Sequence, residues 1–220
     1  MRKFDQYCPV AHALSLVGER WALLIVRELL HGPKRYTDLT HGLPGIGTNI
    51  LAARLKDLEA CGVIRKRTLP PPAASTVYEL TEYGAGLKEA LYALARWGAR
   101  TIGPPGPDDE LYPEWGLNAL PALFNPDAAR GLTETYALVV DGDAFTARVV
   151  DGALEASVGC AEDADLVVEM DMETFFGLAS GELAPRDAMR AGGAHVRGKL
   201  EALERCFKVL SFAPRVTVAA

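Results

Sequence analysis

The segment from Ile46 to Leu80 constrains the fold of this chain most strongly, because its first part has the pattern of a half-buried surface helix. Between Thr48 and Cys61, leucines recur at i, i+4 and i+7, the spacing of one apolar stripe on an α-helix. These stripe residues are Leu51, Leu55 and Leu58. The residues expected to point away from the stripe are Asn49, Ala52, Ala53 and Lys56. The pattern predicts a helix that buries one face and presents small or polar groups on the other.

A short basic hairpin is predicted directly after this helix. Gly62 ends the helix, and residues 63–68 and 76–80 have the composition of two strands around a Pro-rich loop. Because side chains alternate along a strand, Arg65 and Arg67 share one face and Lys66 lies on the other. Helix followed by basic hairpin is the element order of a winged helix-turn-helix, so double-stranded DNA is the first partner to consider.

The distribution of charge along the chain supports a polyanion as partner. The whole chain has a net charge of -6, which taken alone argues against nucleic acid. Residues 1–102, however, hold 14 Lys and Arg against 9 Asp and Glu, a net of +5. Residues 103–220 hold 9 against 20, a net of -11. Such asymmetry between halves is typical of a polyanion-binding module joined to a different domain.

Side chains that recognise base edges are short or carry hydrogen-bonding groups, and the exposed face of the predicted helix fits that description. Arg54 lies on its flank, where it would contact phosphate or pair with an acid of its own domain. Thr37 is the expected N-cap of a short helix that comes before the helix predicted between Thr48 and Cys61. The DNA-binding candidates are Thr37, Thr48, Asn49, Ala52, Ala53, Arg54, Lys56, Arg65, Lys66 and Arg67.

The rest of the chain predicts two domains of different class. Residues 1–102 are expected to be mainly helical apart from the wing, with one long helix from about Thr81 to Thr101. Residues 103–111 are rich in Pro and Gly and are expected to be a linker. In residues 112–220, alternating strands are joined at Asp141-Gly142 and Asp151-Gly152, which are strong hairpin pairs. Helices follow, so an α+β domain with an antiparallel sheet covered by helices is predicted.

The first hundred residues resemble the HxlR-type winged-helix transcriptional regulators. The resemblance covers about residues 5–102 and is carried by the segments 8–10, 21–29, 32–39, 50–59, 62–64 and 77–84, together with Trp97. It implies a homodimer built from the first and last helices, acting on a near-palindromic operator. One departure is Gly47, which stands where the family usually has a capping Ser or Thr; Thr48 could shift the helix start by one.

The same resemblance draws attention to Cys8, because the cysteine at that position senses oxidants in some members of the family. A sensing thiol needs exposure and a lowered pKa, which a helix N-terminus or nearby cations favour. Cys8 opens a predicted helix. Cysteine is also often buried as a small hydrophobic residue, so a structural role is the other interpretation. Cys61 is the candidate second thiol if geometry allows.

The second half resembles the sterol-carrier-protein family, small α+β domains that enclose a lipid-sized cavity. The residues that carry this resemblance lie in 140–142, 151–154, 165–168, 174–181 and 196–198. It implies a pocket for a small hydrophobic ligand, and a solid core without a vacancy is the alternative. The expected lining residues are Trp115, Leu123, Phe124, Phe145, Phe175, Phe176 and Phe207.

No catalytic motif is present: there is no nucleophile elbow, no HExxH and no phosphate-binding glycine loop. The four cysteines have no metal-like spacing and suit reduced thiols in a cytoplasm. The sequence predicts no enzyme, no cofactor, no metal site and no membrane partner.

The leading hypothesis is a cytoplasmic, dimeric transcriptional regulator whose second domain senses a small hydrophobic ligand. The alternatives are a thiol-based redox regulator acting through Cys8, and a lipid-carrier or dimerisation role for the C-terminal half.

Overall fold

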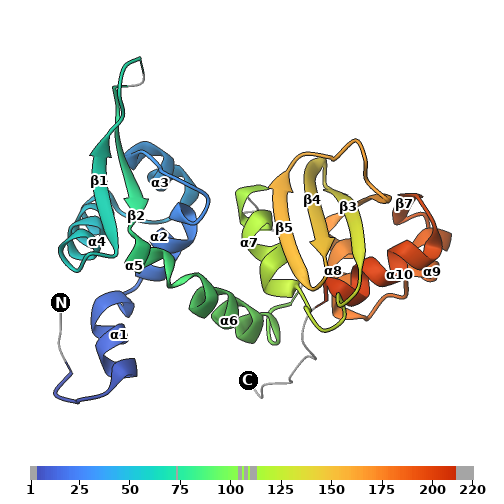
Figure 1. Cartoon of the computed structure of the whole chain (residues 1–220), viewed down its shortest axis with the longest axis horizontal. Coiled ribbons are helices and arrows are strands. Elements are labelled where there is room, and N and C mark those ends of the chain that lie inside the picture. Colours follow the sequence, from blue (N-terminus) through green and yellow to red (C-terminus); the bar gives the residue numbers. More distant parts are fainter. Residues whose placement is uncertain (1–3, 73, 104–105, 107–108, 110–112, 212–220) are drawn as a thin grey trace. The chain divides into compact units, whose positions relative to one another are not determined.

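A computed structural model of the chain divides into two compact units, residues 1–91 and 92–220 (Figure 1). The structure describes all residues except 1–3, 73, 104–105, 107–108, 110–112 and 212–220. Most of the expected linker, 103–111, therefore lies outside the described residues. The two units are described separately, and the domain boundaries expected from the sequence stay a prediction.

The first unit consists of helices and one hairpin. Its helices are α1 (Pro9–Val17), α2 (Ala22–Leu29), α3 (Tyr36–Gly42), α4 (Thr48–Ala60) and α5 (Glu82–Ala85), followed by the start of α6 (Lys88–Ala99), and its strands are β1 (Ile64–Thr68) and β2 (Thr76–Leu80). The division between the units falls inside α6. The core of this unit is formed by apolar side chains of α2, α3, α4 and the base of the hairpin. The predicted winged helix-turn-helix is confirmed.

The predicted register of α4 is confirmed. Leu51, Leu55 and Leu58 are at most 2% exposed, and they pack into the core of the unit. The helix ends at Ala60, and Gly62 follows with a φ of 75°, the left-handed backbone that glycine adopts without steric cost.

The hairpin also has the predicted strands. β1 and β2 pair antiparallel, with Arg65 opposite Glu79 and Arg67 opposite Val77. Lys34 adds a backbone bridge to Tyr78, which ties the outer side of β2 to the segment before α3. In Figure 1 the hairpin projects away from the helices of its unit.

Two sequence-based expectations for this unit are wrong. The N-cap of α3 is Arg35 rather than Thr37, because the Asp38 carboxylate accepts a hydrogen bond from the Arg35 backbone N–H at 2.8 Å and sets the start of the helix earlier. The expected long helix over 81–101 is two helices, α5 and α6, with a break at Gly86 and Leu87. Glycine has low helix propensity, which favours a break at this point.

The second unit is a five-stranded sheet with helices. Its helices are α7 (Pro113–Leu123), α8 (Met172–Ser180), α9 (Pro185–Arg190) and α10 (Leu200–Val209), and its strands are β3 (Thr133–Val140), β4 (Asp143–Val150), β5 (Ala153–Val158), β6 (Leu166–Met170) and β7 (Ala194–Arg197). The strand order is β5-β4-β3-β6-β7. The α+β class is confirmed.

The sheet is mixed, which corrects the expected antiparallel sheet. β3 pairs with β6 in parallel, whereas the β3–β4, β4–β5 and β6–β7 pairs are antiparallel. The reason is the connection from β5, which returns the chain to the opposite side of β3 and enters β6 in the same direction as β3. A parallel pair requires a long crossover, which here runs from β3 through β4 and β5, and the last segment before β6 has no local turn signal in the sequence.

One face of the sheet forms the core of this unit. Tyr136, Leu138, Ala147, Val149 and Leu166 share that face by register and are fully buried beneath side chains of the helices. Both predicted hairpin turns are present, since Asp141 and Asp151 and the glycines after them all have positive φ, as a type I′ turn requires.

Among the described residues, no single helix is long and apolar enough to cross a membrane. α1 and α2 reach that length and composition only as a pair, and they are bent by 79° at the break between them.

Candidate nucleic-acid interface

The exposed face of α4 carries the side chains expected to contact bases. Thr48, Asn49, Ala52, Ala53 and Lys56 are all exposed, on the opposite side of the helix from its buried leucines. The two alanines leave the backbone accessible, and the amide and the ammonium supply hydrogen-bonding groups. The structure therefore brings five of the ten DNA-binding candidates onto one continuous surface.

The start of α4 is fixed by α3 rather than by a side-chain cap. Gly47 is the N-cap, with extended backbone and no capping hydrogen bond from a side chain, and the helix begins at Thr48. The Tyr36 hydroxyl of α3 donates to the Thr48 carbonyl at 2.8 Å. The helix start is therefore not shifted, and the orientation of α4 is tied to the preceding helix.

Arg54 and Thr37 flank this surface. The Arg54 guanidinium lies 2.7 Å from an Asp57 oxygen and 3.6 Å from a Glu19 oxygen, so it adopts the intradomain pairing that the sequence left open. Thr37 is exposed in the first turn of α3, with its hydroxyl 3.5 Å from an Asp38 oxygen. Their contacts with DNA stay predictions.

A buried carboxylate beneath the helices was missed by sequence reasoning. Glu28 of α2 is 3% exposed and accepts hydrogen bonds from Arg27 at 2.8 and 3.1 Å and from Lys34 at 3.3 Å. Arg27 also donates to the Gly42 carbonyl at the end of α3, at 3.4 Å. A Cβ on Gly42 would lie 2.3 Å from a Glu28 oxygen, so a larger residue there would require the buried carboxylate to move. This cluster ties the end of α3 to α2, and its two cations offset the charge of the buried carboxylate. The sequence signal that could have indicated this buried carboxylate is the helical spacing of Glu28 among apolar residues.

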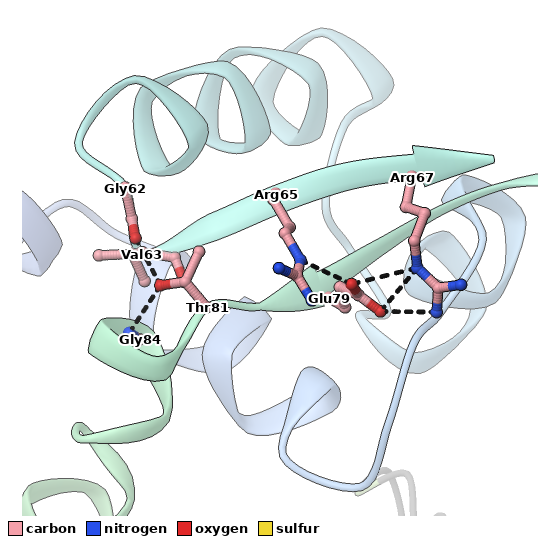
Figure 2. A network of polar contacts seen from close by, with 7 residues as sticks. All are labelled: Gly62, Val63, Arg65, Arg67, Glu79, Thr81 and Gly84. Carbon is pink, nitrogen blue, oxygen red and sulfur yellow. Dashed lines mark hydrogen bonds and ion pairs between the residues drawn. The ribbon is translucent and has the colours of Figure 1, made fainter.

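The wing arginines converge on a single acid (Figure 2). Arg65 Nε donates to Glu79 Oε1 at 2.7 Å, and Arg67 Nη2 donates to Glu79 Oε2 at 2.8 Å. Arg67 Nε lies 3.1 and 3.2 Å from the two oxygens. Hydrogen bonds from Arg67 and then Arg65 lower the pKa of Glu79 from its ordinary value. Lys66, on the other face of β1 as predicted, is exposed and opposite Tyr78.

The base of the wing is joined to α5 by Thr81 (Figure 2). Its hydroxyl donates to the Gly62 carbonyl at 2.6 Å, with the Val63 carbonyl 3.2 Å away, and accepts from the Gly84 N–H at 3.0 Å. A Cβ on Gly84 would lie 1.9 Å from the Val63 carbonyl oxygen. Close packing that only glycine permits therefore sets where the hairpin leaves the helices.

The redox candidate Cys8 is half-buried at the N-cap of α1, with extended backbone. Cys61, the candidate second thiol, is half-buried, and its sulfur lies 3.4 Å from the Leu58 carbonyl oxygen. Both are free thiols. In the other unit, burial raises the pKa of the Cys206 thiol, whereas Cys160 is exposed.

The expected ligand-binding residues lie in the second unit with different degrees of burial. Leu123, Phe145, Phe176 and Phe207 are buried, whereas Trp115, Phe124 and Phe175 are partly buried. The rings of Phe175 and Phe207 meet edge to face, 6.1 Å apart. Phe145 packs closely on α7, since a Cβ on Gly116 would lie 2.6 Å from its ring. Their role in binding a ligand stays a prediction.

A hollow of about 220 Å³ lies on the other face of the sheet, between β4, β5 and the segment that follows β5. It is lined by Thr146, Arg148, Glu155, Ser157, Val158, Gly159, Cys160 and Ala161. None of the expected ligand-binding residues contributes to it.

Comparison with known proteins gives each unit a match. The family model described as HxlR-like helix-turn-helix matches residues 16–105, and the model of the SCP-2 sterol transfer family matches residues 117–211. The HTH-type transcriptional regulator YodB of Bacillus subtilis is 36% identical over 98 residues, which are 44% of this chain and 88% of YodB. An HTH-type transcriptional regulator of Mycobacterium tuberculosis is 33% identical over 142 residues, 64% of this chain and 89% of the relative.

Solved structures also align with part of the chain. Reduced YodB from B. subtilis aligns at 34% identity with a TM-score of 0.40, covering 46% of this chain and 100% of YodB. The redox regulator HypR in its oxidised form aligns at 26% identity with a TM-score of 0.41, covering 44% of this chain and 99% of HypR.

The geometry of the wing generates the first prediction. Arg65→Ala and Arg67→Ala should each weaken binding to duplexes of any sequence, because a cation that neutralises a phosphate would be lost. The plot of log K against log salt concentration should flatten by about 0.9 units for each phosphate contact removed. Fluorescence anisotropy over a series of salt concentrations measures this slope. Arg130→Ala, an exposed arginine of the second unit that also pairs with an acid, is the matched control. Unchanged slopes for both wing variants would exclude the wing from the interface.

Proposed function

The chain belongs to the family of HxlR-like helix-turn-helix transcriptional regulators, and we propose that it acts as a homodimer on a near-palindromic operator. The observation that carries this proposal is the exposed, hydrogen-bonding face of α4 above a fully buried leucine stripe. In the proposal α4 enters the major groove. Asn49 then bonds adenine, Lys56 reaches guanine or phosphate, and Ala52 and Ala53 allow close approach.

Unpartnered apolar side chains support the dimer. Val10 and Leu14 on α1 are 67% and 50% exposed, and Leu94 and Trp97 on α6 are 49% and 69% exposed. Each pair lies at helical spacing, so both helices present an apolar stripe to solvent. Exposed apolar stripes on helices are typical of protein–protein interfaces. A two-fold dimer formed through these helices would present two copies of α4 to two half-sites.

Selection from a random DNA pool tests this proposal. The wild-type protein should select two inverted half-sites. Asn49→Ala and Lys56→Ala should each relax the preference at particular positions in both half-sites, by about 1–3 kcal/mol for a lost bidentate contact. Glu59→Gln, at the far end of the same helix, is the control that should leave the motif unchanged. An identical motif for all variants would show that α4 does not select the sequence, and a single unrepeated site would contradict the dimer.

We also propose that the second unit binds a small hydrophobic ligand and that its occupancy changes DNA binding. The match to the SCP-2 sterol transfer family supports the choice of ligand class. Coupling requires the ligand to prefer one arrangement of the dimer over another, typically by about 1–3 kcal/mol. A lipid-carrier or dimerisation role, without regulation, is the rival function for this unit.

The sheet register identifies the variant that tests ligand binding. Ala147 is fully buried on the face of the sheet that packs against the helices, so Ala147→Trp would fill any vacancy there. Solvent extraction and mass spectrometry of the purified wild-type chain should recover a hydrophobic molecule, and the variant should carry less of it while still binding DNA. Ala153→Trp, at an exposed position of the edge strand β5, is the control. If the core is solid, the wild type should yield no ligand and Ala147→Trp should only destabilise, by about 1–3 kcal/mol.

Redox sensing through Cys8 is the second candidate function. The related YodB has been solved in diamide-treated and quinone-bound forms. In this chain Cys8 is the N-cap of α1 and is half-buried. Diamide should lower the DNA affinity of the wild type and leave Cys8→Ser unaffected. Cys160→Ser, which removes an exposed thiol of the other unit, should respond as the wild type does. An equal response of Cys8→Ser and wild type would exclude Cys8.

A further inference from the structure

The wing holds one carboxylate between two guanidinium groups (Figure 2). The Glu79 side chain is 11% exposed, whereas those of Arg65 and Arg67 are 65% and 45% exposed. The acid therefore lies at the bottom of the cluster and the two cations lie above it. All three side chains are on one face of the hairpin by register, because Arg65 is directly opposite Glu79 and Arg67 is two residues along the same strand.

The bonds to Glu79 leave a defined set of donors unused. Arg65 gives only its Nε to the carboxylate, and Arg67 gives its Nε and Nη2. Within the part of the chain that the structure describes, neither Nη of Arg65 nor Nη1 of Arg67 donates a hydrogen bond. These outward-facing N–H groups match the oxygens of a phosphate, which guanidinium groups bind in a fixed, planar geometry.

We propose that Glu79 is a positioning residue that fixes Arg65 and Arg67 as one phosphate-binding fork, and that it thereby raises the preference for the operator over other DNA. The inference rests on the proposed function, since it needs the wing to contact the DNA backbone. Long arginine side chains lose rotamer freedom when they bind a phosphate. The bonds to Glu79 already restrict both side chains in the free protein, so less conformational entropy is lost on DNA binding. The same carboxylate reduces the charge of the fork from two to one, which lowers its attraction for a duplex of any sequence.

Two substitutions at Glu79 separate its effect on the position of the arginines from its effect on the charge of the fork. Glu79→Gln keeps the shape and removes the charge, whereas Glu79→Asp keeps the charge on a side chain one methylene shorter, which cannot bridge both arginines. Glu82→Gln removes the same charge from an exposed residue of α5 and is the matched control. Affinities of the full chain are measured for a selected operator and for a random-sequence duplex of equal length, and their ratio is compared among variants.

Glu79→Gln should bind the random duplex more tightly, by about fivefold, the effect of one unit charge about 4 Å from another in water. Its affinity for the operator should rise less, so the ratio falls. Glu79→Asp should bind the operator more weakly with little change on the random duplex, so the ratio falls again. In the Arg65→Ala/Arg67→Ala background neither substitution should alter the ratio, since a change of charge alone acts equally on both duplexes.

The proposal is overturned if both Glu79 variants keep the wild-type ratio of operator affinity to random-duplex affinity. That result is expected if Glu79 only stabilises the hairpin, in which case the variants would lower the melting temperature without changing the ratio. If Glu79→Gln does not fold, Glu79→Asp decides the outcome. If the two arginine variants bind both duplexes as the wild type does, the wing lies outside the interface. In that case both the proposed interface and this inference are wrong. This result differs from one in which the wing contacts DNA and only the proposed role of Glu79 is wrong.

Discussion

Leu51, Leu55 and Leu58 of α4 are almost fully buried, and this packing determines which residues the helix can present to a partner. Truncating one buried leucine to alanine typically costs about 2–5 kcal/mol, so the rotation of the helix about its axis is strongly specified. With the leucines inside, Asn49, Ala52, Ala53 and Lys56 must face outward, as the structure shows. The chemistry of the exposed surface is thus a consequence of core packing on the other side of one helix.

Polar contacts then place this helix and the wing relative to one another within the first unit. Tyr36 fixes the start of α4, the Glu28 cluster ties the end of α3 to α2, and Thr81 fixes the base of the hairpin. At Gly84 the backbone of Val63 leaves no room for a side chain, and at Gly42 a side chain would displace the Glu28 carboxylate. A rigid base of this kind allows exposed side chains to act at defined positions, which is what discrimination between DNA sequences requires.

The parts of the structure with a local signal were predictable from the sequence. The leucine periodicity gave α4, the Gly62 stop gave its end, and Asp-Gly pairs gave two hairpin turns of the second unit. Features that depend on distant residues were not predictable in this way. The parallel pairing of β3 with β6 depends on a crossover through β4 and β5, and the segment that leads from β5 into β6 has no turn motif. The break between α5 and α6 was missed because apolar residues on both sides of it have helical spacing.

The same distinction holds for the candidate site. Exposure of the α4 face followed from periodicity, and the shared face of Arg65 and Arg67 followed from strand alternation. Their common partner Glu79 requires the exact hairpin register, which depends on the conformation of the Pro-rich loop. The N-cap position of Arg35 depends on Asp38, a capping residue inside α3, whereas Thr37 had only the residue type of a cap.

Site-directed photo-crosslinking measures whether the exposed face of α4 contacts bases. A photoreactive phenylalanine analogue in place of Ala52 should crosslink the full chain to a base inside each half-site of a selected operator. The same analogue in place of Ala153, exposed on β5 of the second unit, should give no crosslink to that DNA. Stable binding of the operator with no crosslink from position 52, or with equal crosslinking from both positions, would contradict the account.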